Sequence, residues 1–306
     1  MASEYADYIF YGGSIITMEK GKPSVEALAV KGTIILAVGK RDEVFALAGP
    51  STEFVHLNDR QTLLPGFIEP HSHAVLMASL KTRINGVERF VKIDGYDHHS
   101  FAEIKLLMEN KIASLDPTAK PLPWALFFGW DSELIPDLPF LSKDVLNDFS
   151  TEIPICVIGQ SGHVAWVNQK AFEIAGVDDS TEDPSGFVKD ENGHLTGQLF
   201  EVPAMKKILG SSPQPKADQM KMAIEEQWRD YASRGFTTVT DLLFCMKSDD
   251  TEETNVALNI LKRVSESQFC PVRLALYRAV DTSGMSANCT PVFFSYGGFD
   301  IIARCV

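Results

Sequence analysis

The hydrophobic positions change their pattern close to residue 60. Before it, short apolar runs such as residues 8–11 and 33–38 are separated by the glycine-containing turns 12–13, 21–23 and 31–32. Runs of this length between turn residues are typical of β-strands. Residues 1–62 are therefore predicted to form a small all-β subdomain, in which residues 41–48 form a short helix ended by Gly49 and Pro50.

From residue 63 onward, apolar runs alternate with segments of helical spacing. Such alternation is typical of a parallel sheet with right-handed helical crossovers, and it predicts an α/β fold with a partial (β/α) barrel of the TIM type over residues 63–306. The predicted strands are 63–68, 124–130, 154–158, 195–200 and 236–241, and the predicted helices include 101–113, 141–149, 164–175 and 216–234.

Composition excludes several classes of function. The net charge of −13 argues against a nucleic-acid partner, which needs a basic surface. The five cysteines are scattered without a CxxC pair, which is typical of a reducing compartment. The first residues are acidic and lack an apolar leader, and no run approaches the ~18 apolar residues of a membrane helix. A cytoplasmic location without a membrane partner is expected.

Candidate chemistry begins with two histidines that follow the predicted strand 63–68. In an extended backbone, residues i and i+2 point to the same side, so His71 and His73 can direct two imidazoles at one point. A divalent metal needs this arrangement from two of its ligands. The alternative is a pair of surface histidines in a turn. His56, His98, His99 and His194 lack a neighbouring ligand pattern and are expected to pack or face solvent.

Three segments of the chain resemble the metal-dependent amidohydrolase superfamily, in the branch called amidohydrolase family 3 (YtcJ-like). They occur in the family's order and match its "PGfID-hHsH", "GHxaWvNskAl" and "PTGxLxE" segments at residues 63–73, 161–171 and 195–201. The chain departs from the pattern at Glu69 and Pro70, where the family more often has Asp-Ala. Shorter similarities to "GwDq" and "GiTtvhD" lie at 129–131 and 236–241. The resemblance implies that the all-β prefix is a small β-sandwich.

The resemblance also implies a mechanism, namely hydrolysis of a non-peptide C–N bond by a water activated on one or two divalent ions, expected to be zinc. In it, His71 and His73 bind the first metal, and Glu201 takes the bridging place of a carboxylated lysine; the alternative is a surface carboxylate. His163 stabilises the oxyanion or binds substrate, or alternatively caps the helix that follows. Asp241 ends a strand and could touch the site.

The remaining implied residues concern the substrate, a small amide whose identity the sequence does not name. Trp130 and Asp131 are expected to line its pocket, although the same tryptophan could belong to a core aromatic cluster. The sequence leaves a homo-oligomer open.

The resemblance weakens toward the end of the chain. The last histidine is His194, whereas the family takes two further metal histidines and an aspartate from later strands. The barrel is accordingly expected to lack its C-terminal part. Two alternatives to an active enzyme follow: a catalytically inactive truncated homologue, and a binding or scaffold protein that keeps the fold.

Overall fold

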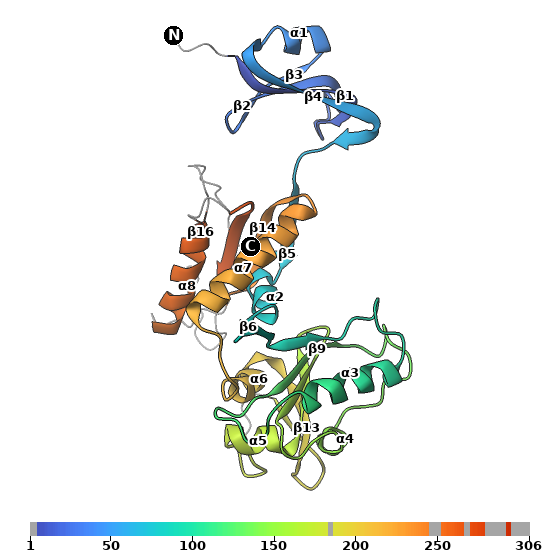
Figure 1. Cartoon of the computed structure of the whole chain (residues 1–306), viewed down its shortest axis with the longest axis vertical. Helices are drawn as coiled ribbons and strands as arrows, with labels where there is room; N and C mark the ends of the chain where they lie inside the picture. Colours follow the sequence, from blue (N-terminus) through green and yellow to red (C-terminus); the bar gives the residue numbers. More distant parts are fainter. Residues whose placement is uncertain (1–4, 183–185, 245–251, 266–269, 279–291, 295–306) are drawn as a thin grey trace. The chain divides into compact units, whose positions relative to one another are not determined.

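The computed structural model describes residues 5–182, 186–244, 252–265, 270–278 and 292–294 (Figure 1). The chain divides into two compact units. The first consists of Met1–Glu69 with Gly235–Thr238, and the second of Pro70–Arg234 with Val239–Val306. The sequence placed a boundary after residue 62, and the units divide after Glu69.

The first unit is built around a four-stranded sheet of order β3-β2-β1-β4. Strand β1 pairs antiparallel with β2 and parallel with β4. Ile9 of β1 and the alternate residues Ala27 and Ala29 of β2 are buried with Val44 of the short helix α1. The described residues of this unit contain this sheet and a helix, so the second layer of a sandwich stays a prediction. The bounds are β1 (Ala6–Ile16), β2 (Ser24–Lys31), β3 (Ile34–Gly39), α1 (Arg41–Phe45) and β4 (Ala48–Leu63).

The second unit contains a six-stranded sheet of order β12-β13-β11-β10-β9-β8. Strands β8, β9 and β10 are parallel, and the other neighbours pair antiparallel. Every residue of β9 and β10 is buried, as expected for central parallel strands. The strands predicted at 124–130 and 154–158 are thereby confirmed. The bounds are β8 (Phe90–Lys92), β9 (Ala125–Trp130), β10 (Ile155–Gly159), β11 (Val164–Val167), β12 (Phe187–Lys189) and β13 (Leu195–Phe200).

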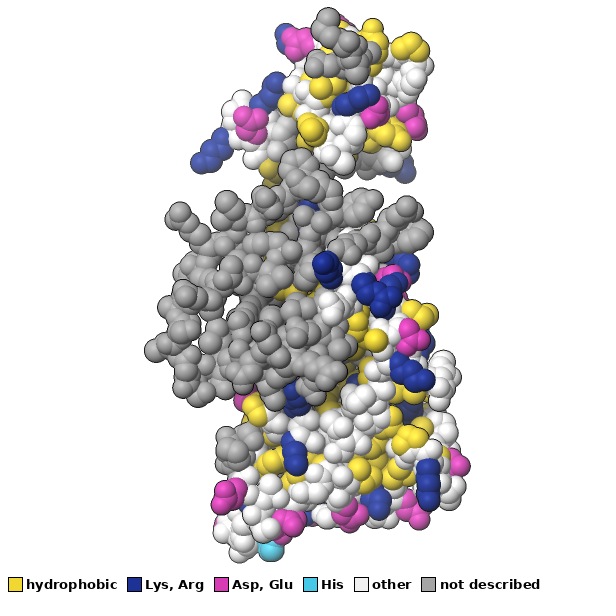
Figure 2. All heavy atoms as spheres, turned by 90° about the vertical axis from the view of Figure 1, so that its left-hand side faces the viewer, with side chains coloured by type: hydrophobic (Ala, Val, Ile, Leu, Met, Phe, Trp, Pro, Cys, Tyr) yellow, Lys and Arg dark blue, Asp and Glu magenta, His cyan; other side chains and the backbone are white. Residues whose placement is uncertain are grey.

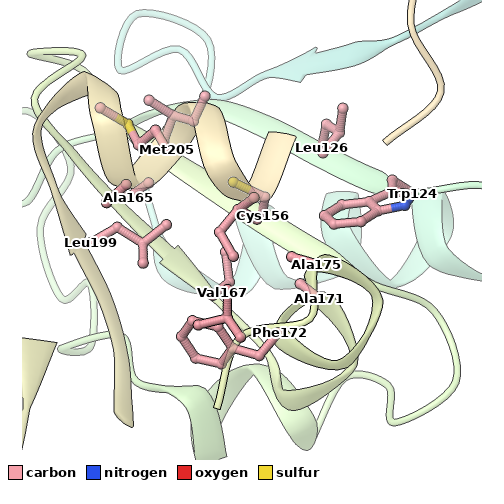
Figure 3. Close-up of a cluster of buried hydrophobic side chains, with 14 of the residues drawn as sticks. Trp124, Leu126, Cys156, Ala165, Val167, Ala171, Phe172, Ala175, Leu199 and Met205 are labelled. Atoms are coloured by element: carbon pink, nitrogen blue, oxygen red, sulfur yellow. The ribbon is translucent and has the colours of Figure 1, made fainter. Parts of the chain in front are cut away.

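Both faces of this sheet are covered because successive strand residues point to opposite sides. Leu126 and Cys156 belong to the cluster shown in Figure 3, which includes residues of α5 and α6. Their neighbours Phe127 and Val157 belong to a second cluster, which includes residues of α3 and α4. The helices are α3 (Phe101–Ala113), α4 (Lys143–Asn147), α5 (Gln169–Ala175) and α6 (Glu201–Leu209).

The helix predicted over residues 164–175 is wrong in its first part. Residues 164–167 form β11, which pairs antiparallel with β10 and β13. The β-branched and aromatic residues of this stretch favour a strand, and tertiary pairing overrides helical spacing. Asn168 then caps α5 by accepting from the Ala171 N–H, and Gly176 ends the helix in the left-handed conformation.

A second sheet has the order β16-β15-β14-β5. Its strands are β5 (Phe67–Ser72), β14 (Phe236–Phe244), β15 (Arg273–Arg278) and β16 (Val292–Phe294), and the neighbouring helices are α2 (Ala74–Leu80), α7 (Ala217–Ser233) and α8 (Glu252–Ser265). A short ribbon pairs β6 (Arg83–Ile84) with β7 (Val87–Glu88). The strands of the described residues thus lie in open sheets, and closure into a barrel stays a prediction.

The predicted strand 63–68 is displaced along the chain. Strand β4 ends at Leu63, and β5 begins only at Phe67 because Pro65 cannot donate to a ladder. It is also not buried as predicted, since Phe67 and Ile68 are 50% and 65% exposed.

The surface agrees with the composition. On the face shown in Figure 2, Lys and Arg side chains are scattered among Asp and Glu side chains, and the absence of a nucleic-acid partner stays a prediction. Among the described residues, the structure has no helix with the length and apolarity needed to cross a membrane.

Candidate functional site

His71 and His73 lie at the junction of β5 and α2. His71 is within the strand, and His73 is the residue that precedes the helix. Their ring centroids are 5.9 Å apart with an interplanar angle of 73°. Two imidazoles that share one tetrahedral zinc ion at ~2.0–2.1 Å have centroids roughly 5–6 Å apart. The observed pair therefore fits the geometry of two ligands on one metal.

The backbone around His73 is held from both sides. The Ser72 hydroxyl lies 2.7 Å from the Tyr231 hydroxyl of α7. On the other side, the Val75 N–H donates to Asp241 Oδ2 at 2.7 Å. Within the described part of the chain, Nδ1 of His73 is buried and has no hydrogen-bond partner. Buried polar atoms usually have a hydrogen-bond partner or a ligand, so this nitrogen is a candidate metal donor.

Asp241 is 1% exposed and lies within β14. The sequence placed it at the end of its strand, but the strand continues for three apolar residues to Phe244. The side chain still reaches the segment after His73, because its carboxylate accepts the Val75 N–H. The structure thus places the predicted catalytic aspartate next to the chain segment that carries the two histidines.

His163 and Glu201 form a second pair. His163 Nδ1 lies 3.1 Å from Glu201 Oε2, and the Glu201 N–H donates to the His163 carbonyl at 2.9 Å. Their side chains are 59% and 64% exposed. His163 lies in the turn between β10 and β11 and does not cap α5, a task that Asn168 performs.

Glu201 also has an unusual backbone. It is the first residue of α6, with φ of +64°. Among the described non-glycine residues, Met18, Asn85 and Asp137 also have positive φ. Asn and Asp tolerate this conformation, whereas a glutamate there is strained by roughly 1–2 kcal/mol. Strain that the surrounding structure maintains is often found at functional positions.

Trp130 and Asp131 line a cavity of about 400 Å³ at the ends of β9, β10 and β11. Trp166 of β11 contributes to the same wall, and so do Gln160 and Ser161, which precede His163. Two segments on which the family resemblance rests, 129–131 and 161–171, therefore contribute to this one region. Trp130 is also a member of the hydrophobic core, and its role in binding substrate stays a prediction.

The predicted metal ligands do not form one set. Among the described residues, no group of three or more His, Cys, Asp or Glu side chains is arranged to hold a metal ion. Glu201 pairs with His163, while His71 and His73 lie next to each other. The ring separation of the two histidines is compatible with a shared metal, and the metal roles of His71, His73 and Glu201 stay predictions.

Sequence reasoning missed two supporting residues. Tyr231 is 159 residues from Ser72, and Val75 is 166 residues from Asp241. No local pattern marks such pairs. The sequence could have indicated that Trp166 lines the cavity, because Trp166 belongs to the block "GHxaWvN", which also contains His163.

Known proteins give an independent comparison. The AepA exoenzymes regulatory protein of Pectobacterium carotovorum subsp. carotovorum is 28% identical over 257 residues, which are 83% of this chain and 52% of that protein. The putative amidohydrolase YtcJ of Bacillus subtilis is 26% identical over 75% of this chain and 41% of its own length. The N-substituted formamide deformylase of Arthrobacter pascens is 22% identical, over 92% of this chain and 46% of its own.

A solved structure has a related fold. An uncharacterized metal-dependent hydrolase from Pyrococcus horikoshii OT3 superposes with a TM-score of 0.55 at 17% identity, covering 89% of this chain and 48% of that one. The chain spans about half the length of the proteins it matches. The profile described as "Amidohydrolase family" matches residues 59–298, which is most of the chain. The protein thus belongs to the amidohydrolase family, in the branch called amidohydrolase family 3.

Proposed function

We propose that this chain carries the first part of a metal-dependent hydrolase site that cleaves a non-peptide C–N bond of a small amide. The observation that supports it most strongly is the His71 and His73 pair, in which one buried nitrogen has no partner within the described residues. The similarity to the Arthrobacter N-substituted formamide deformylase supports an N-acyl or formamide substrate.

The two histidines would hold the metal, which we propose to be zinc because imidazole nitrogen suits that ion. When bound, such an ion lowers the pKa of a coordinated water toward neutrality and polarises a carbonyl. Asp241 fixes the backbone after His73 through the Val75 N–H, and thereby the direction of the second imidazole. A fixed backbone next to His73 limits the directions that its imidazole can take.

His163 and Glu201 suit the stabilisation of a developing oxyanion. If His163 donates its Nδ1–H to the Glu201 carboxylate, Nε2 accepts in the neutral ring and donates in the protonated ring. In the protonated ring, this Nε2–H can donate to an oxygen that gains charge. Glu201 would act here as a positioning residue for His163.

Metal analysis and turnover test the proposal together. The chain, purified with zinc present and desalted, should retain about one zinc per molecule and hydrolyse N-benzylformamide. His73→Ala should lose both properties, whereas His99→Ala, a change of an exposed histidine in another loop, should lose neither. If wild type and His73→Ala retain equal zinc, the ligand assignment is wrong.

A binding or scaffold role is the second candidate. The described residues contain no set of three metal donors, and one relative is named as a regulatory protein. Under this proposal, the chain would bind a small amide without turnover. Retained function of His73→Ala in cells, with no zinc in the purified wild type, would favour this second candidate.

We also propose a reducing, cytoplasmic setting, because Cys156 and Cys270 are both free.

A further inference from the structure

The cavity beside Asp131 has a composition that selects a ligand. Its volume of about 400 Å³ falls within the range of small-molecule sites. Trp130, Phe140 and Trp166 supply aromatic walls, and the two tryptophans are held in place by burial, being only 6% and 8% exposed. Phe140 is 74% exposed and forms an accessible edge of the wall. Such a wall suits an apolar or aromatic group of a ligand.

Asp131 gives this cavity its charge. Its Oδ1 accepts the Glu133 N–H at 2.8 Å, which fixes the carboxylate within its turn. The described residues provide no basic partner for it, and the cavity lining contains no Lys, Arg or His among them. A carboxylate beside aromatic faces attracts a cation through both charge and the ring quadrupoles. An anionic ligand would instead be repelled.

A second polar group in the wall is the indole N–H of Trp166. In the described part of the chain, the Trp166 indole Nε1 is buried and has no acceptor. Buried indole N–H groups usually find a partner. The charged group that the cavity lining offers to a ligand is the Asp131 carboxylate.

We infer that this cavity binds an amine-bearing arm of the substrate, with its ammonium group facing Asp131 and its apolar part against the aromatic wall. The inference rests on the proposed function only in treating the occupant as part of an amide substrate. Binding of the amine itself needs neither metal nor turnover. Asp131 is thus a residue that determines substrate class.

Two probes of the same shape and opposite charge test this on the full chain. 2-Phenylethylammonium and phenylacetate are titrated by calorimetry in metal-free buffer, with tryptophan fluorescence as a second readout. The ammonium should bind at least about tenfold more tightly than the carboxylate. Equal binding of both probes to the wild type would overturn the inference without any variant.

Asp131→Asn removes the charge and keeps the Oδ1 acceptor for the Glu133 N–H, so the turn is preserved. It should weaken ammonium binding about tenfold and leave the circular dichroism spectrum unchanged. Asp137→Asn is the matched control, because Asp137 is exposed, lies outside the cavity lining, and has a positive φ that asparagine tolerates. Equal effects of the two substitutions would also overturn the inference.

These outcomes separate the two proposals. Ammonium binding that depends on Asp131, in a chain that hydrolyses no amide, would support the cavity assignment and count against the hydrolase. Hydrolysis of N-benzylformamide without preference between the probes would overturn the cavity assignment alone.

Discussion

Two carboxylates that the sequence placed at strand ends differ in almost every physical respect. Asp241 is 1% exposed and receives a backbone N–H from a residue far along the chain. The Glu201 side chain is 64% exposed, pairs with a neighbouring histidine, and sits on a backbone with φ of +64°. Loss of the contact of the buried Asp241 should lower the free energy of unfolding strongly. Loss of the exposed pair of Glu201 and His163 should lower it only slightly, because solvent screens the pair. We therefore expect substitutions of Asp241 to change mainly the stability of the fold, and substitutions of Glu201 to change mainly the turnover.

The largest effect is expected at Asp241. Asp241→Ala would leave the Val75 N–H without its acceptor in a buried site, and the free energy of unfolding should fall by about 2–3 kcal/mol. Asp241→Asn keeps an oxygen acceptor and should recover much of this loss. Urea denaturation of the three proteins measures the difference. If Ala and Asn are equally destabilised, the hydrogen bond does not hold the segment after His73.

A smaller effect of opposite sign is expected at Glu201. Glu201→Gly relieves the left-handed strain, so stability should rise by about 0.5–1 kcal/mol after the entropy cost of glycine is included. The exposed pair with His163 contributes little to stability, so its loss does not reverse the sign. Hydrolysis should nevertheless fall, because His163 loses its partner.

Glu201→Gln separates the two roles of this residue. It keeps both the strain and an oxygen that accepts from His163, but it removes the charge. Stability should then stay within about 0.5 kcal/mol of the wild type while turnover falls. A gain in stability for Gln equal to that for Gly would show that charge, and not backbone strain, explains the change.

The sequence predicted correctly those elements that depend on a single physical effect, such as the burial of an apolar run or the local geometry of the chain. Strands β9 and β10 are apolar throughout, so their burial followed from composition. His71 and His73 are two residues apart in the chain, so local geometry keeps them close, and their ring centroids are 5.9 Å apart. Strand β11 was missed because its partners β10 and β13 determine it.

Other features arise only from the folded backbone. The conformation of Glu201 and the contacts of Tyr231 with Ser72 and of Asp241 with Val75 depend on tertiary packing. Such contacts join residues more than 150 positions apart, a separation at which no periodicity operates. The family blocks nevertheless located the cavity, since Trp130, Asp131 and Trp166 all lie in or beside them.

The smallest effect concerns His194 and Asp179, an exposed histidine and carboxylate that serve as a reference for the His163 and Glu201 pair. The nitrogen and oxygen are 2.8 Å apart. The hydrogen bond to Asp179 raises the pKa of His194, and the same bond, with that from the Leu195 N–H, lowers the pKa of Asp179. A histidine with a raised pKa stabilises the fold below its ordinary value of ~6.5, and this is lost as pH rises through the raised value. Asp179 remains ionised in the same range because its pKa is lowered.

His194→Ala should therefore lower Tm by about 1 °C at pH 5.5 and leave it unchanged at pH 9, since solvent screens an exposed pair. Scanning calorimetry of both proteins at the two pH values measures this, with His99→Ala as the control that should show no such difference. A larger effect of His194→Ala at pH 9 than at pH 5.5 would contradict the assigned direction.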